Sequence, residues 1–334
     1  MLQPQTRLHF LAAGAAAAAA ALPLPAFSQT TPLRVILFFG ASTWPLWIAQ
    51  SKGFYAREHL SVQITNTPNS AYMYEHMNAG DFDIAHSAVD NIFAVDEGQG
   101  EVASATDFFA FMGVDNGFLR LYARPEIRSY ADLRGKAVAV DALTTGYAFV
   151  LRKMLEKNGL SDTDYRLVAA GGTPGRAQKL QSDGDFVATL VTPPFDAQLK
   201  AKGYTLLGNA TDVIGRYQGI TGNTRRSWAQ AHQDVLVGYI RAFVAALGWL
   251  YDPKNRDEAI AIYVDAAKVT PDIAAQTYAA AVEPAGGLFP RARIDVEGLR
   301  TTLALRSQYA KPQKTLTDPL KYIDESYYRR AVGG

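Results

Sequence analysis

The sequence predicts an α/β protein of two similar lobes, each a mostly parallel sheet flanked by helices, with a cleft between the lobes and a helical C-terminal region. The main observation is an internal repeat. Residues 60–85 and 164–189 both read as strand, loop, helix, Gly-Asp-Phe turn and strand, with an offset of 104 residues. A strand–helix unit precedes each copy, at 33–54 and 136–160. Alternating strands and helices are typical of parallel sheets, and two tandem copies predict two lobes.

The first lobe is expected to contain parallel strands at 35–39, 62–65 and 82–86. Each is a short apolar run that ends at glycine, asparagine or serine, as buried strands do. The runs 101–105 and 108–112 then lead the chain out of this lobe.

The second lobe is expected to open with a strand at 118–123 and to continue with its first parallel strand at 136–140. The second copy of the repeat supplies the next strands, and 204–208 ends the pattern. Residues 215–222 read as a return strand that crosses back to the first lobe.

The C-terminal region is expected to be helical and to pack on the first lobe. Apolar residues recur there at helical spacing and form one face: Val235, Tyr239, Phe243, Leu247 and Leu250. Asp252-Pro253 ends this helix, and further helices are expected at 257–264, 271–281 and 295–309. This region carries no catalytic motif of its own.

The composition is that of an ordinary globular protein. Of the 334 residues 48% are hydrophobic and 19% are charged, and the formal net charge is +1. Without a basic field we expect no binding to nucleic acid and none to an anionic membrane surface. The chain has no cysteine, which excludes thiolate metal sites, disulfides and cysteine nucleophiles. We expect no metal and no cofactor.

The N-terminus resembles a cleavable signal peptide. Arg7 and His9 precede an apolar run at 10–24, and small residues permit cleavage after Ser28. A transmembrane anchor is the alternative, but the run is short and prolines break its end. Since a lipoprotein needs a cysteine after its signal, we expect an unlipidated periplasmic protein. The expected organisation is a signal peptide at 1–28, the first part of lobe 1 at 32–110, lobe 2 at 113–210, and a return to lobe 1 with the C-terminal helices at 213–334.

A family resemblance covers most of residues 33–250. The segment 33–60, with Ser42-Thr43-Trp44-Pro45 and Lys52-Gly53-Phe54-Tyr55, resembles the opening of the nitrate/sulfonate/thiamin-precursor class of periplasmic binding proteins. Further similar segments are 77–83, 130–140 and 183–188. The resemblance implies a type II periplasmic-binding-protein fold that binds a small molecule between its lobes. It also implies an ABC-type importer whose inner-membrane permease is the partner, and we expect the binding protein to be a monomer.

In open parallel sheets, ligands bind at the carboxyl ends of the strands, so the candidate residues lie in the loops that follow them. In the first lobe these candidates are Ser42, Thr43, Trp44, Asn69, Ser70, Tyr72, Ser87 and Asp90. Trp44 either stacks on a ligand or covers the core of its lobe. Asp90 either accepts a hydrogen bond from a ligand or caps a helix.

The equivalent loops of the second lobe contribute the candidates Thr144, Thr145, Tyr147, Thr173 and Phe195. Hydroxyl groups and free N–H groups at helix starts suit an anion, and Phe195 could form an apolar wall. Arg176 either pairs with a ligand carboxylate or sulfonate or begins a solvated helix.

The sequence therefore favours a non-enzymatic receptor for a small organic solute, such as a sulfonate, a pyrimidine or an aromatic carboxylate. One alternative is an enzyme similar to thiamin-pyrimidine synthases, although that branch uses a cysteine-rich segment that this chain lacks. A ligand-sensing module for a membrane receptor is another. The chain has no Gly-x-Ser-x-Gly, His-Glu-x-x-His or phosphate-loop motif.

Overall fold

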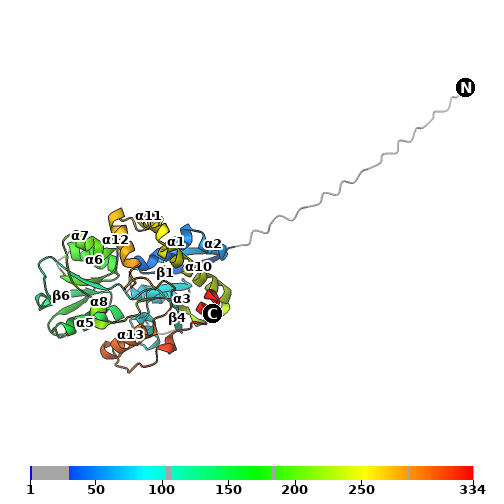
Figure 1. Ribbon diagram of the computed structural model, residues 1–334. Coiled ribbons are helices and arrows are strands. Elements are labelled where there is room, and N and C mark those ends of the chain that lie inside the picture. The colour runs from blue at the N-terminus through cyan, green and yellow to red at the C-terminus, as the bar shows by residue number, and fades with distance from the viewer. Residues whose placement is uncertain (2–29, 103–106, 183–184, 285, 334) are drawn as a thin grey trace.

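The protein forms two lobes, each built on a five-stranded sheet with flanking helices (Figure 1). The computed structural model describes residues 1, 30–102, 107–182, 185–284 and 286–333. Within these residues the strand orders are β2-β1-β3-β10-β4 and β7-β6-β8-β5-β9. The predicted two-lobed α/β architecture is confirmed. The expected signal peptide at 1–28 lies, apart from Met1, outside the described residues.

The first sheet combines parallel strands with one antiparallel strand from a distant part of the chain. Its strands are β1 (Thr31–Leu37), β2 (Leu60–Asn66), β3 (Ile84–Ala88), β4 (Phe108–Gly113) and β10 (Ile220–Arg225). Strand β1 pairs in parallel with β2 and β3, and β10 runs antiparallel between β3 and β4. Both β3 and β4 are buried along their whole length, although β3 includes the polar residues His86 and Ser87.

The second sheet repeats this arrangement position by position. Its strands are β5 (Arg120–Ala123), β6 (Ala137–Val140), β7 (Arg166–Ala169), β8 (Ala188–Val191) and β9 (Thr205–Asn209). Strand β6 pairs in parallel with β7 and β8, and β5 is the antiparallel strand between β8 and β9. The two antiparallel strands follow the two crossings between lobes, at 114–119 and 210–219. The expected return strand begins later than predicted, at Ile220, because Gly215 (φ 73) ends a short helix first.

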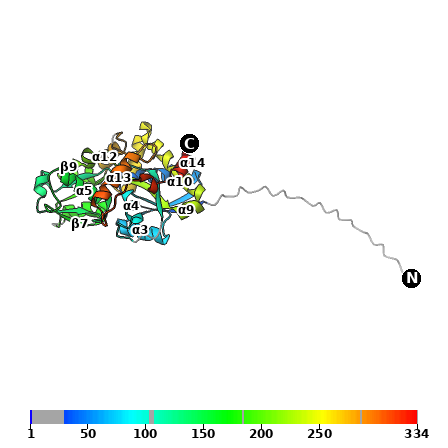
Figure 2. The ribbon, with the colours of Figure 1, turned by 90° about the horizontal axis from the view of Figure 1, so that it is seen from below.

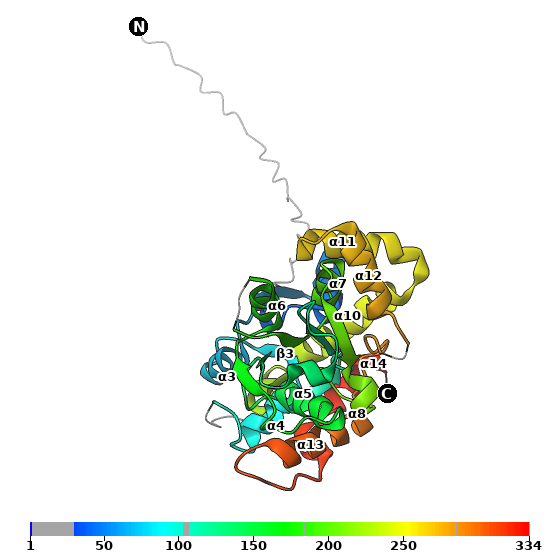
Figure 3. The ribbon, with the colours of Figure 1, turned by 90° about the vertical axis from the view of Figure 1, so that its left-hand side faces the viewer.

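Helices connect the strands and cover the sheets, and Figures 2 and 3 show them from two further directions. In the two sheet lobes they are α1 (Trp44–Ser51), α2 (Phe54–Arg57), α3 (Ser70–Ala79), α4 (Asp90–Asp96), α5 (Gly146–Lys157), α6 (Thr173–Ser182), α7 (Phe195–Ala201) and α8 (Ala210–Ile214). In the C-terminal region they are α9 (Arg226–Ala231), α10 (Gln233–Tyr251), α11 (Arg256–Ala267), α12 (Pro271–Ala281), α13 (Val296–Tyr309) and α14 (Ser326–Val332). Short 3₁₀ helices occur at Ala41–Thr43, Tyr130–Leu133, Pro253–Asn255 and Pro319–Tyr322.

The C-terminal helices pack mainly on the first lobe, but they also reach the second. Helix α10 contacts α1, α2 and α14. By length and composition α10 could cross a membrane, yet it is mostly buried here and serves as a core helix. Helix α13 packs against α5 of the second lobe, and α12 contacts α7. The C-terminal region thus packs on the first lobe, as the sequence predicts, and also contacts the second lobe, which the sequence does not predict.

Trp44 belongs to this core and does not face the cleft. Its side chain is fully buried, and its Nε1–H donates to the carbonyl oxygen of Ala259 at 3.1 Å. The ring of Tyr263 lies 4.1 Å from the Trp44 ring, centroid to centroid, and that of Tyr278 lies 5.9 Å away. The interpretation of Trp44 as a ligand-stacking residue is therefore replaced by core packing, since α11 and α12 enclose its indole.

We expect Trp44→Ala to lower the free energy of unfolding by about 3–5 kcal/mol, because it removes a large buried ring and leaves a cavity. Urea denaturation followed by circular dichroism would measure the loss. Trp228→Ala provides the control, since Trp228 is only partly buried and stacks on His232. A loss no larger than that of the control would contradict the assignment of Trp44 to the core.

Asp96, the last residue of α4, is half-buried, and its ionisation should have a measurable effect on stability. Its Oδ1 has no hydrogen-bond partner among the described residues. Burial, with a smaller effect from the nearby Asp107, raises the pKa of Asp96 to about 7. The folded protein therefore holds the proton of this carboxyl more tightly than the unfolded chain does.

As the pH rises from about 4 through 7, the ionisation of Asp96 should lower the free energy of unfolding. We expect Asp96→Asn to raise the melting temperature at pH 8, and the gain to shrink as the pH falls toward 4. Differential scanning calorimetry across this range would test the effect. The exposed Asp265, changed to Asn, is the control that should show no comparable pH-dependent gain.

Candidate functional site

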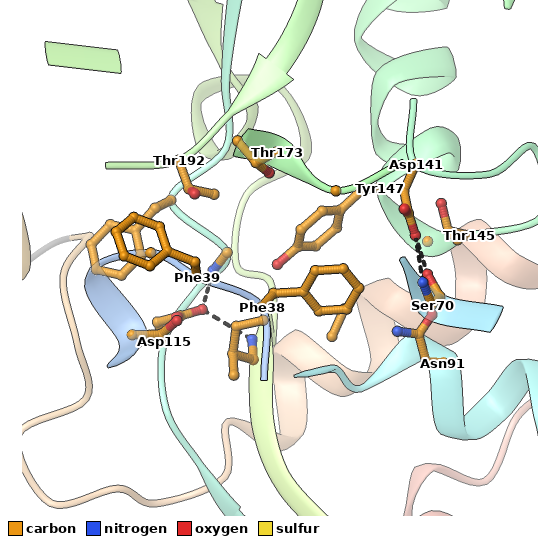
Figure 4. A pocket seen from close by; sticks show the side chains of 18 of the residues that line it. Phe38, Phe39, Ser70, Asn91, Asp115, Asp141, Thr145, Tyr147, Thr173 and Thr192 are labelled. Carbon is orange, nitrogen blue, oxygen red and sulfur yellow. Dashed lines mark hydrogen bonds between the residues drawn. The ribbon is translucent and has the colours of Figure 1, made fainter. Parts of the chain in front are cut away.

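The main cavity lies between the lobes, at the carboxyl ends of strands from both sheets (Figure 4). Its walls come from the loops after β1, β2 and β3 and from the matching loops after β6, β7 and β8. It holds about 630 Å³ of empty space, part of it open to solvent. This is the position at which open parallel sheets bind ligands.

Three helices of ten or more residues begin at this cavity. Ser70 starts α3, Gly146 starts α5 and Thr173 starts α6, and all three line the wall. Asn69 stabilises the first of these starts, because its Oδ1 accepts a hydrogen bond from the N–H of Tyr72 at 2.8 Å. The repeated strand–loop–helix pattern thus brings matching helix starts of the two lobes to one place.

Aromatic rings form much of the wall. Phe38 and Phe39 follow β1, Phe118 lies on the first crossing, and Tyr147 lies in the first turn of α5. Figure 4 shows the Tyr147 hydroxyl pointing into the cavity. This hydroxyl has no partner among the described residues, and burial raises the pKa of Tyr147 well above its ordinary value.

Asp115 lines the cavity from the first crossing. Its Oδ1 accepts the N–H of Gly117 at 2.7 Å and that of Ile220 at 3.0 Å, and its backbone carbonyl accepts the N–H of Gly219 at 2.9 Å. Asp115 therefore ties the two crossings together. Burial raises its pKa to about 6, although the two backbone donors oppose that rise.

Asp141 and Ser70 form a polar contact between the lobes. Oδ2 of Asp141 accepts the Ser70 hydroxyl and also its backbone N–H, the latter at 3.3 Å. Oδ1 of Asp141 is buried and has no partner among the described residues.

Arg176 is buried in the second lobe and lines the cavity as well. Its guanidinium donates to Thr189 Oγ1 at 2.9 Å, to Thr173 Oγ1 at 3.2 Å and to the carbonyl oxygens of Gly171 and Leu190. Burial lowers the pKa of Arg176 to about 10. The interpretation of Arg176 as a solvated helix start is therefore wrong.

The two lobes touch on both sides of the cavity. The N–H of Ala41 donates to the carbonyl oxygen of Pro193, and the N–H of Gly172 donates to that of Pro68, both at 2.9 Å. The rings of Phe39 and Phe195 meet edge to face at 5.8 Å. These contacts, together with the Ser70–Asp141 pair, describe a closed arrangement of the lobes.

Five of the candidates predicted from the sequence line this cavity together: Ser42, Ser70, Thr145, Tyr147 and Thr173. Thr144 instead lines a smaller neighbouring cavity that shares Ser70, Asn91 and Thr145 with the main one. Phe195 does not line the main cavity and contacts its wall residue Phe39 from behind.

Other candidates of the first lobe lie outside the cavity wall. Thr43 is buried and its Oγ1 accepts the N–H of Gly40, Trp44 is in the core, and Asn69 caps α3. Tyr72 is 36% exposed and packs on the ring of His76. Ser87 is fully buried and its hydroxyl lies 2.9 Å from the Tyr74 hydroxyl. Apart from Ser87, which lies within β3, these positions follow strand ends, but their side chains turn into the lobe or out to solvent.

Asp90 is neither a ligand group nor a simple cap. It pairs with Arg306 of α13 through two hydrogen bonds, at 2.7 and 2.5 Å, and both side chains are at most 1% exposed. The partner lies 216 residues away in the sequence, so the loop alone could not reveal it.

The sequence interpretation did not single out several wall residues: Phe38, Phe39, Asn91, Asp115, Phe118, Asp141 and Thr192. Asp141 directly follows the apolar run of β6, so the strand-end rule could have predicted it as a wall residue. Asp115 lies on a crossing rather than after a parallel strand, so the strand-end rule could not find it.

Comparisons with known proteins agree with this geometry. The sequence model described as NMT1/THI5-like matches residues 41–256. The chain belongs to the NMT1/THI5-like family. The resemblance seen in the sequence is confirmed, whereas a comparison with curated protein sequences gives no match.

Solved structures similar to this member of the NMT1/THI5-like family share its fold. The periplasmic nitrate-binding protein NrtA from Synechocystis PCC 6803 is 14% identical, with a TM-score of 0.77 over 91% of this chain and 89% of that one. The alkanesulfonate-binding protein SsuA from Xanthomonas axonopodis pv. citri, bound to MOPS, is 19% identical, with a TM-score of 0.67 over 83% and 91%. The desulfurization enzyme DSZB is 14% identical, with a TM-score of 0.59 over 90% and 99%. The chain therefore has the two-lobed periplasmic-binding-protein fold.

Gly146 allows the lobes to approach each other. A Cβ atom at this position would lie 2.5 Å from Cβ and Cγ of Asp90, which Arg306 holds in place. We expect Gly146→Ala to disfavour the closed arrangement and to increase the radius of gyration measured by small-angle X-ray scattering. Gly248→Ala is the control, because a Cβ there meets nothing within 4 Å. Scattering curves that are identical for both variants and the wild type would contradict this expectation.

Proposed function

We propose that the protein is the substrate-binding component of an ABC-type importer. It captures a small organic solute in the cavity between its lobes and delivers the solute to a permease in the inner membrane. The observation that carries the proposal is the cavity between two contacting lobes in a member of the NMT1/THI5-like family. We place the protein in the periplasm, as a monomer released from its signal peptide.

Capture would depend on a hinge at the two crossings between the lobes. We infer that bending there, within 114–119 and 210–219, separates the helix starts that line the cavity and admits the solute. Closure then restores the contacts across the cleft, including the Ser70–Asp141 pair and the Phe39–Phe195 contact. The closed form would be the one that docks on the permease.

The aromatic wall favours a ring-bearing or partly apolar solute over a bare inorganic ion. Phe38, Phe39, Phe118 and Tyr147 offer surfaces for packing against a ring. Sulfonates, pyrimidines and aromatic carboxylates are the classes expected from the sequence. Affinity in the micromolar range requires about 8 kcal/mol, which a stacked ring and a few hydrogen bonds can supply.

We infer that the protein binds its solute without transforming it. Conversion of a bound solute by the purified protein, detected by mass spectrometry, would instead support the enzymatic alternative. Loss of uptake in a strain that lacks the gene would support transport, whereas intact uptake with a lost transcriptional response would support sensing.

A thermal-shift screen of the mature protein would test the proposal first. The panel contains alkyl and aryl sulfonates, pyrimidines, aromatic carboxylates, nitrate, and aromatic amines and amidines. A ligand at a hundred times its dissociation constant should add about 2.7 kcal/mol to the free energy of unfolding. The absence of any shift across the whole panel would count against the receptor proposal.

We expect Tyr147→Phe to weaken binding of a ligand found in the screen by about 1 kcal/mol, because it removes a hydroxyl that has no partner among the residues that the structure describes. Isothermal titration calorimetry would measure the change. Tyr263→Phe is the matched control, since its hydroxyl is also buried and unpartnered but lies in the core beside Trp44. Equal affinities of the two variants would place the site elsewhere.

A further inference from the structure

The charges around the cavity are unequal. The charged groups among the described wall residues are two carboxylates, those of Asp115 and Asp141, and one guanidinium, that of Arg176. When both carboxylates are ionised, the wall therefore carries a formal charge of −1. A ligand enclosed there meets this charge at short range and with little intervening water.

Arg176, the one cation among the described wall residues, is already engaged in hydrogen bonds. Arg176 directs hydrogen bonds from all three of its nitrogens to oxygens of its own lobe. These acceptors are hydroxyls and backbone carbonyls. The negative charge of Asp141 also lies close enough to the guanidinium to stabilise its positive charge. Arg176 therefore has little capacity left to neutralise a ligand anion.

The unused polar atoms of the wall are mostly acceptors. Oδ1 of Asp141 is buried and has no hydrogen-bond partner in the described part of the chain. Asp115 is 1% exposed, and the two backbone donors both bind its Oδ1, which leaves Oδ2 for a ligand. The Tyr147 hydroxyl can accept as well as donate, and no described residue bonds to it.

We propose that the ligand is a small cation with N–H donors on a flat or ring-bearing frame, of the amidinium, guanidinium or primary-amine class. The inference rests on the proposed receptor function and names the charge of its solute. Asp115 supplies the principal counter-charge, the Tyr147 hydroxyl accepts a further hydrogen bond, and the rings of Phe38 and Tyr147 pack against the frame. In Figure 4 these two rings lie between Asp115 and Asp141.

Two physical effects favour such a cation over an oxyanion. A charge-assisted hydrogen bond to a carboxylate is stronger than a neutral one, and aromatic faces attract cations. An oxyanion beside Asp115 would be repelled unless that carboxyl took up a proton. The structurally similar SsuA and NrtA are described as alkanesulfonate- and nitrate-binding proteins. This chain would therefore use the same fold to bind a ligand of the opposite charge.

The test compares probes of matched shape and opposite charge. Benzamidine and benzoate both carry a planar group on a phenyl ring, but benzamidine is a cation with N–H donors and benzoate is an anion. We expect titration calorimetry and thermal shift at pH 7.5 to detect benzamidine and to detect benzoate at least tenfold more weakly. Benzenesulfonate and nitrate should behave like benzoate.

Asp115→Asn should lower the affinity for benzamidine at least tenfold. The variant should fold, because the amide oxygen of asparagine can still accept the N–H groups of Gly117 and Ile220. Asp96→Asn is the control, since Asp96 is also a carboxyl whose pKa is raised by burial, although it is only half-buried, and it does not line the cavity. Ser70→Ala distinguishes an effect of wall charge from an effect of lobe closure. It removes the side-chain hydrogen bond between the lobes but keeps the carboxylate of Asp141.

Stronger binding of benzoate, benzenesulfonate or nitrate than of benzamidine would overturn the inference and leave the receptor proposal standing. Equal benzamidine affinity in the Asp115→Asn and Asp96→Asn proteins would overturn it too, as would the absence of binding by every amine and amidine probe. The receptor proposal is contradicted by a different result, in which no probe of either charge shifts the melting temperature of the protein.

Discussion

The cleft depends on one buried ion pair. The Arg306 guanidinium bonds the Asp90 carboxylate at the start of α4 and also donates to the carbonyl oxygen of Thr144, at 2.8 Å, just before α5. It lies 5.0 Å from the ring of Phe149. A single side chain of α13 thereby fixes a loop of each lobe. Removal of one partner from such a pair typically costs about 3–5 kcal/mol, because the other charge is left buried and unpaired.

The polar groups of the cavity divide into those that hold the protein together and those that remain free. Arg176 and Oδ1 of Asp115 belong to the first set, since their hydrogen bonds fix the second lobe and the two crossings. The free oxygens of Asp115 and Asp141 and the Tyr147 hydroxyl belong to the second. Asp115 and Asp141 therefore each use one oxygen to hold the protein together and keep the other oxygen free. A solute bound to the free oxygens would contact the groups that join the two crossings and the two lobes.

The repeat was sufficient to predict the architecture because strand periodicity and turn residues are local signals. Strands β3 and β8 begin at Ile84 and Ala188, at the predicted offset of 104 residues. The site was predicted only in part. Ser70 and Tyr147 follow strand ends and line the cavity, but the same rule selected Trp44 and Asp90. Their partners, Tyr263 and Arg306, are brought to them by helices more than 200 residues later, and no local pattern carries that information.

The position of β10 constrains the order in which the chain can acquire its structure during synthesis. The second sheet, from β5 to β9, is made of one continuous segment and is complete once residue 209 has emerged. In the first sheet β10 separates β3 from β4, so β4 has no neighbouring strand until residues 220–225 arrive. The lobe that begins the sequence is therefore the last to finish folding, because β1, β2 and β3 can pair with one another but β4 has no neighbouring strand until β10 is made.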